Sequence, residues 1–168
     1  MKKIILIFFC LTFSFNCFSK SCEVPREKLK ILDIKLNQSV ESIIKAHSGI
    51  TLDHYSHSKD VIGDLFIPRD IKGWTGQTLV DDFIYIKYIK SNLKVSSFGA
   101  NLNLMEMPED KARDIIIAAF NLPQKNWVKT VEDDPKYGES FTYEYSCADY
   151  NLSILNYSNG VSLHISNK

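Results

Sequence analysis

Hydrophobic side chains recur at helical spacing in two places along the chain. Each stripe follows a residue that favours the start of a helix, Ser39 in one case and Pro108 in the other. The first stripe consists of Val40, Ile43, Ile44 and His47. The second stripe consists of Ala112, Ile115, Ile116 and Ala119. The spacing predicts two amphipathic helices, over about residues 40–47 and 108–119.

Alternating hydrophobic and polar residues follow each predicted helix and are typical of strands in a half-buried sheet. A short strand is also expected over residues 32–36. Asn159-Gly160 separates two alternating runs and predicts a tight hairpin, and Phe98-Gly99-Ala100 is expected to make the equivalent turn in the first half. The residues expected on the core side are Leu93, Val95, Leu152, Ile154, Val161, Leu163 and Ile165.

The order of these elements occurs twice. Ile43-Ile44 aligns with Ile115-Ile116, and Asn92-Leu93-Lys94-Val95 aligns with Asn151-Leu152-Ser153-Ile154. We therefore predict an α+β fold made of two tandem repeats, about residues 31–100 and 101–168, each a helix followed by three strands. The strands are expected to form one antiparallel sheet with both helices packed on one face. The alternative is chance similarity between two ordinary α+β stretches.

The N-terminal segment has the order of a secretory signal peptide. Lys2-Lys3 precedes an uncharged run from Ile4 to Phe15, and small or polar residues follow. The run is too short to span a bilayer as a helix. We expect residues 1–19 to be removed and residues 20–168 to fold as a single domain in the periplasm or outside the cell. The alternatives are a short membrane anchor, or a lipoprotein acylated on Cys22 or Cys17.

Cysteine content and charge narrow the class of protein. Removal of residues 1–19 leaves Cys22 and Cys147, which we expect to form a disulfide in an oxidising compartment; the alternative is two buried thiols. The chain has 20 basic and 20 acidic residues, so it lacks the basic excess of nucleic-acid-binding proteins. It contains no phosphate loop, dinucleotide fingerprint or nucleophile elbow. We therefore expect no nucleic acid partner, no cofactor and no catalytic site.

Two histidines in Asp53-His54-Tyr55-Ser56-His57 form the strongest candidate metal site. At a spacing of three, they would share one face of a helical turn, with His47, Asp60 and Asp64 as further ligands for zinc or copper. The flanking residues match no zinc-enzyme pattern, and we interpret the stretch as a polar loop without a metal. A metal-dependent enzyme that uses His54 and His57 is retained as an alternative function.

Aromatic residues give the clearest indication of function. Tyrosine and tryptophan combine a large apolar surface with one polar group, and they are concentrated in protein-binding surfaces. Since two helices can cover only one face of a sheet, we expect some of these rings on an open face that binds another protein. The alternative is that the rings fill the core or stack across strands. The expected binding residues are Trp74, Tyr85, Trp127, Tyr143 and Tyr145.

Two stretches carry a resemblance to a known fold. Leu36-Asn37-Gln38-Ser39 leads through Ile43-Ile44 to Gly49-Ile50-Thr51, and Met107-Pro108 leads through Ile115-Ile116 to Asn121-Leu122-Pro123. This pattern of a turn, a capped helix and a helix stop resembles the tandem repeats of the beta-lactamase-inhibitor-protein fold. A single repeat is also similar to the small outer-membrane assembly lipoproteins. The resemblance covers nearly the whole mature chain and implies a binding module without catalysis.

These observations predict an exported, non-catalytic protein-binding module of the inhibitor or immunity kind. The alternative is an envelope-assembly or structural protein, in contact with the membrane only if Cys22 is lipidated.

Overall fold

A computed structural model describes residues 22–47, 51–56, 61–68, 79–89, 91–104, 107–136, 138–157 and 160–168. The first elements are a short 3-10 turn, η1 (Arg26–Lys28), the strands β1 (Lys30–Ile31) and β2 (Ile34–Lys35), and helix α1 (Val40–Ala46). Strands β3 (Thr51–Ser56), β4 (Val61–Pro68), β5 (Val80–Ile89) and β6 (Lys94–Leu102) follow. Helix α2 (Glu109–Ala119) precedes β7 (Val128–Asp134), β8 (Gly138–Ser146), β9 (Tyr150–Tyr157) and β10 (Gly160–Asn167).

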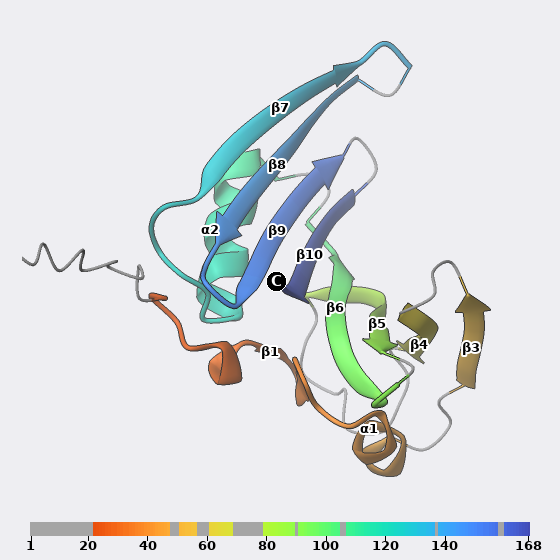
Figure 1. The fold of residues 1–168 in the computed structure, drawn as a ribbon. Coiled ribbons are helices and arrows are strands. Elements are labelled where there is room, and N and C mark those ends of the chain that lie inside the picture. The colour runs from red at the N-terminus through yellow and green to blue at the C-terminus, as the bar shows by residue number, and fades with distance from the viewer. Residues whose placement is uncertain are drawn as a thin grey trace, which may run out of the picture.

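Strands β3 to β10 form one antiparallel sheet in the order β3-β4-β5-β6-β10-β9-β8-β7 (Figure 1). Four strands follow each helix within the described residues, and the two groups meet where β6 pairs with β10. The prediction of an α+β fold with an antiparallel sheet is confirmed. The prediction of three strands per half is wrong, because residues 51–68 and 128–134 contribute strands that the sequence pattern did not indicate. Duplication of the two halves stays a prediction.

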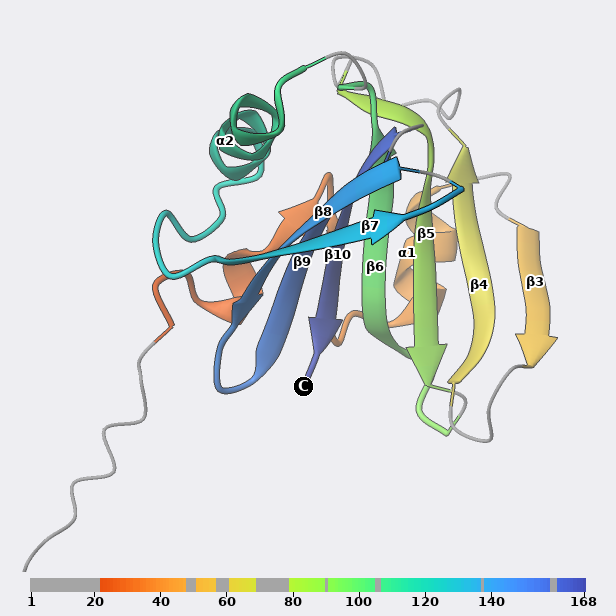
Figure 2. The ribbon, with the colours of Figure 1, turned by 90° about the horizontal axis from the view of Figure 1, so that it is seen from above.

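Both helices and the N-terminal segment, residues 22–36, lie on the same side of the sheet (Figure 2). We call this side the covered face. Six of the seven residues expected on the core side are buried there or at its margin: Val95, Leu152, Ile154, Val161, Leu163 and Ile165. Leu93 is 52% exposed, because it lies in the turn between β5 and β6 with a positive φ of 51°. Burial of each large aliphatic side chain contributes roughly 1.5–3 kcal/mol.

The two predicted helices are confirmed, with small shifts in their buried faces. Helix α1 buries Val40 and Ile43, whereas Ile44 is 37% exposed. Helix α2 buries Ala112, Ile116 and Ile117, followed by Phe120 just after its end. Its buried stripe is therefore rotated relative to the expected one, which included Ala119; that residue is exposed.

Turns account for the other local differences. A hairpin between β9 and β10 is confirmed, but Gly160 is the first residue of β10 and lies opposite Tyr157, so the turn begins one residue earlier than the predicted Asn159-Gly160. The turn predicted at Phe98-Gly99-Ala100 is wrong, because these residues lie inside β6. The strand expected over residues 32–36 is interrupted by a turn in which Leu32 has a φ of 55°, which leaves the two short strands β1 and β2.

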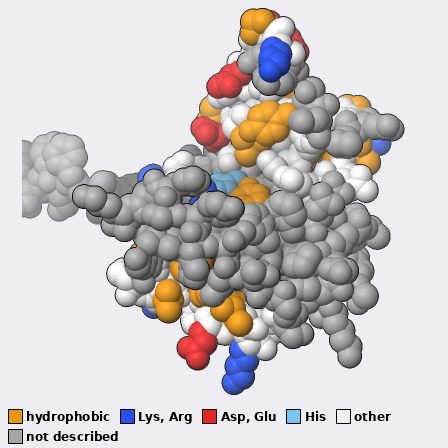
Figure 3. Space-filling view, turned by 90° about the vertical axis from the view of Figure 1, so that its right-hand side faces the viewer, with side chains coloured by type: hydrophobic (Ala, Val, Ile, Leu, Met, Phe, Trp, Pro, Cys, Tyr) orange, Lys and Arg blue, Asp and Glu red, His pale blue; other side chains and the backbone are white. Residues whose placement is uncertain are grey.

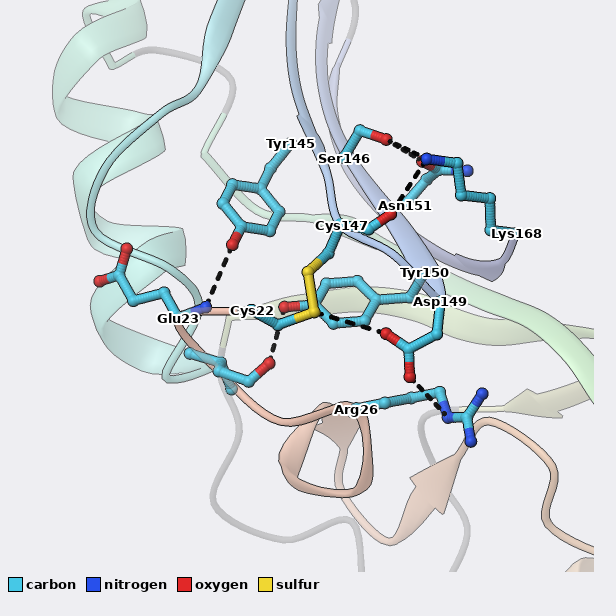
Figure 4. The surroundings of a disulfide bond; sticks show 11 residues. Cys22, Glu23, Arg26, Tyr145, Ser146, Cys147, Asp149, Tyr150, Asn151 and Lys168 are labelled. Atoms are coloured by element: carbon cyan, nitrogen blue, oxygen red, sulfur yellow. Dashed lines mark hydrogen bonds and ion pairs between the residues drawn. A yellow bond between two sulfur atoms is a disulfide. The ribbon is translucent and has the colours of Figure 1, made fainter. Parts of the chain in front are cut away.

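The predicted disulfide between Cys22 and Cys147 is present, with its Cα atoms 5.6 Å apart (Figure 4). It connects the N-terminal segment to the end of β8. Disulfides of this kind are typical of oxidising compartments. The expected signal peptide, residues 1–19, lies outside the described residues. Within the described part of the chain, no helix has the length and apolar character needed to cross a membrane.

Candidate functional site: the open face of the sheet

The face of the sheet opposite the helices carries mostly polar side chains on strands β8 to β10. The sheet is strongly twisted, so β7–β9 and β3–β5 lie at a large angle to each other (Figures 1 and 2). A histidine side chain is visible at the molecular surface in the space-filling view (Figure 3). We call the face of the sheet opposite the helices the open face.

Six polar side chains on this face form two rows that cross three adjacent strands. In the first row, His164 of β10 lies opposite Ser153 of β9, which lies opposite Glu144 of β8. In the second row, Ser166, Asn151 and Ser146 follow one another in the same way. These residues line a hollow of about 410 Å³, together with parts of Tyr145 and Leu152. We refer to it as the polar hollow.

Of the six polar side chains in these rows, three have hydrogen-bond partners and three have none among the described residues. The Ser146 hydroxyl donates to Asn151 Oδ1 at 2.8 Å, and Lys168 Nζ donates to Ser146 Oγ at 3.2 Å (Figure 4). Within the described part of the chain, the side chains of Glu144, Ser153 and Ser166 have no hydrogen-bond or ion-pair partner. These three groups are therefore available to bind an external molecule.

A tyrosine, a glycine and a histidine form the central row of the open face. Tyr85 of β5 lies opposite Gly99 of β6, and Gly99 lies opposite His164 of β10. The rings of Tyr85 and His164 stack with their centroids 5.9 Å apart and their planes 15° apart. A Cβ atom on Gly99 would overlap the Tyr85 ring and the carbonyl oxygen of Leu163. Glycine at this position therefore allows Tyr85 to lie across β6 and reach β10.

Burial in this row shifts the pKa values of both rings. Burial, with a smaller contribution from Tyr157, raises the pKa of Tyr85 to about 12, so its hydroxyl stays protonated at neutral pH. Burial, with a smaller contribution from Lys87, lowers the pKa of His164 below its ordinary value, which favours the neutral imidazole. The Tyr85 hydroxyl lies 3.3 Å from His164 Nδ1. The hydroxyl also donates to the Leu163 carbonyl oxygen at 3.5 Å, so it donates to or accepts from His164 Nδ1 according to the tautomer of the ring.

Serine, histidine and glutamate occur together here, but not in the order of a nucleophilic triad. A triad needs a carboxylate next to the histidine, on the side away from the nucleophile. In this row Ser153 separates His164 from Glu144, and the Nδ1 atom of His164 faces Tyr85 instead. Among the described residues of this row, no carboxylate lies next to His164.

Two of the five predicted binding residues, Tyr143 and Tyr145, lie on the covered face of the sheet. Tyr143 and Tyr145 are only 2% and 6% exposed on the covered face. Their spacing of two does place them on one face, but α2 and the N-terminal segment cover it and supply polar partners for their hydroxyls. The Tyr143 hydroxyl lies 2.8 Å from carboxylate oxygens of both Glu109 and Asp110. The backbone N–H of Glu23 donates to the Tyr145 hydroxyl at 3.3 Å.

Of the other three, only Tyr85 is found on the open face. Trp127 packs against the core from the covered side, where its indole N–H donates to the Pro123 carbonyl at 2.7 Å. Its ring centroid lies 5.8 Å from that of Tyr145. Trp74 lies outside the described residues. The prediction that these rings lie on an open face is therefore wrong for Tyr143 and Tyr145; Trp127 was expected in a connection beside the sheet, and its part in binding stays a prediction.

The helical turn that the metal alternative required is absent from the described residues 51–56. Residues 51–56 form strand β3 instead of the expected loop or a helical turn, so His54 lies on an extended backbone. His57 and Asp60 lie outside the described residues. Among the described residues, the one group with metal-ligating atoms close together is Cys22, Cys147 and Asp149, and its cysteines are joined by the disulfide.

The polar hollow was not among the predicted sites, although the alternation of apolar and polar residues in β9 and β10 indicates it. The residues expected on the core side include Leu152, Ile154, Leu163 and Ile165. Ser153 and His164 lie between the members of each pair. The same alternation that places one set on the covered face places the other on the open face.

No protein-family model, curated protein or solved structure matches this chain.

Proposed function

We propose that the protein is an exported, non-catalytic binding module that holds another protein against the open face of its sheet. The observation that carries this proposal is the contrast between the two faces. One face is sealed by α1, α2 and the N-terminal segment. The other presents the polar hollow with the unpartnered side chains of Glu144, Ser153 and Ser166.

The chemistry of the open face supports a protein partner. Serine and asparagine provide adaptable hydrogen bonding in protein-binding surfaces, and tyrosine provides rigid contact area. Tyr85 is held by its stacking on His164, so little side-chain entropy is lost on binding. The strands that carry these groups are paired on both sides, which keeps the surface rigid.

The disulfide argues against acylation of Cys22, one of the two cysteines considered in the lipoprotein alternative. The Cys22 sulfur is bonded to Cys147 and is therefore not free for acylation. The mirrored strand order of the two halves is what a duplicated scaffold would produce, so we retain the proposal of a tandem repeat resembling the beta-lactamase-inhibitor-protein fold. That resemblance implies a binding module, and the disulfide-tied frame supports an inhibitor or immunity role for it.

Site-specific photo-crosslinking in the producing cells tests the proposal. A photoreactive residue at Ser153 lies in the polar hollow, whereas one at the exposed Lys111 of α2 lies on the opposite side and serves as the matched control. We expect a discrete protein adduct from position 153 only, and we expect Glu144→Lys to abolish it. Equal adducts from both positions, or none from position 153, would contradict a docking role for the open face.

A further inference from the structure

Strand β7 forms one edge of the described sheet. It is hydrogen-bonded to β8 through a continuous seven-residue register, from Val128 opposite Glu144 to Asp134 opposite Gly138. Its other side has no strand partner within the described residues. All side chains described in β7 are exposed, and Val128 and Val131 are exposed by 63% and 50%. Natural edge strands are usually blocked by a proline, a bulge or charged side chains. Strand β7 has no proline and no bulge but carries four charged residues, so it can pair only with a strand of complementary charge.

The charges on β7 are distributed unevenly along the strand. Lys129 is near its start, and Glu132, Asp133 and Asp134 are at its end. Lys129, Val131 and Asp133 share one side of the strand, because side chains alternate. They lie opposite Tyr143, Phe141 and Glu139, so this is the side that continues the covered face.

Symmetry limits how β7 can pair with a copy of itself. A two-fold axis normal to the sheet makes the two strands antiparallel and keeps each face on the same side, so one residue must lie opposite itself. Centres at Lys129, Glu132 or Asp133 place identical charges opposite each other, which is destabilising. A centre at Thr130 places Lys129 opposite Val131. A centre at Val131 pairs all seven residues and places Lys129 opposite Asp133 twice.

We propose that β7 pairs with β7 of a second copy of this chain, in the antiparallel register centred on Val131. The two valines meet at the axis, and a Lys129–Asp133 pair forms on each side of it. Lys129 also forms an ion pair with Glu109 of its own chain. An ammonium group has three donors, so it can bridge Glu109 and the second copy's Asp133. The inference is independent of the proposed function, because the dimer extends the sheet and leaves both open faces uncovered.

Cysteine cross-linking tests the register. Opposite Cα atoms in an antiparallel pair are about 4.5–5.5 Å apart, within the range for disulfides of about 4.4–6.8 Å. We expect Val131→Cys to give a covalent dimer on mild oxidation. In the proposed register, the two copies of residue 130 are about 8 Å apart, so the matched control Thr130→Cys is expected to stay monomeric. Equal cross-linking of both variants, or none with Val131→Cys, would overturn the register.

The oligomeric state tests the dimer without an added cysteine. Light scattering coupled to size exclusion is expected to give twice the mass of one chain for the wild-type protein. Asp133→Lys places two lysines opposite each other and is expected to halve that mass, and adding Lys129→Asp is expected to restore it. Far-UV circular dichroism confirms that each variant is folded. A wild-type monomer at about 0.5 mM, or a dimer unaffected by Asp133→Lys, would refute self-pairing; the monomer result would indicate that the edge receives a strand of another protein.

Discussion

Replacing both Cys22 and Cys147 with alanine is expected to lower the free energy of unfolding by about 4–5 kcal/mol. The bond joins residues separated by 125 positions, so its loss releases most of the unfolded chain from a single large loop. A domain of this size is usually stable by only about 5–15 kcal/mol, so the loss is a large share of the total. Urea denaturation followed by circular dichroism, with the oxidised wild-type protein as reference, measures the difference.

Non-covalent contacts around the bridge give this prediction a matched control. The Tyr150 hydroxyl donates to the Val24 carbonyl at 2.7 Å, and Arg26 and Asp149 form an ion pair at 3.5 Å (Figure 4). Both members of the ion pair are more than a third exposed, so Arg26→Ala is expected to cost less than about 1 kcal/mol. If the double cysteine variant were as stable as Arg26→Ala, the covalent bond would not be what secures the N-terminal segment.

Gly99→Ala is expected to destabilise the protein by about 1–3 kcal/mol and to displace Tyr85 from His164. The added methyl group overlaps both the Tyr85 ring and the Leu163 carbonyl, and the carbonyl belongs to the paired strand β10. Urea denaturation measures the loss of stability, and NMR of the His164 ring protons reports the loss of stacking.

The matched control is Gly160→Ala, because a Cβ atom there has no neighbour within 4 Å and the backbone does not require glycine. We expect that variant to change the free energy of unfolding by less than about 0.5 kcal/mol. In a Tyr85→Ala background, Gly99→Ala is expected to cost less than in the wild type, because only the overlap with the carbonyl remains. An equal cost in both backgrounds would show that Tyr85 does not lie across Gly99.

Much of the fold was predictable because its signals are local. The stripes that begin at Val40 and Ala112 defined both helices, and the alternation in residues 150–166 defined the central strands. Cys22 and Cys147 could be paired because they are the two cysteines outside the expected signal peptide. By contrast, apolar and polar residues do not alternate regularly along β7, and all of its described side chains are exposed. Its strand structure depends on pairing with β8, a contact that no local pattern specifies.

The candidate site was harder to predict because it depends on which face becomes covered. Tyr143 and Tyr145 carry hydroxyl groups, which made a solvated face plausible for them. Glu109, Asp110 and the backbone of Glu23 supply the partners that allow both rings to be buried. Those partners come from residues at least 33 positions away in the chain, so only the folded structure reveals them.

Cysteine accessibility along β9 tests most directly whether the sheet has an open face. Ser153 lies in the polar hollow, and its neighbour Ile154 is 1% exposed on the covered face. Under native conditions, Ser153→Cys is expected to react with a maleimide at nearly the rate of an exposed thiol. Ile154→Cys is expected to react orders of magnitude more slowly, because labelling must wait for transient opening. Equally slow labelling at both positions would contradict the account, because the surface proposed to bind a partner would then be covered.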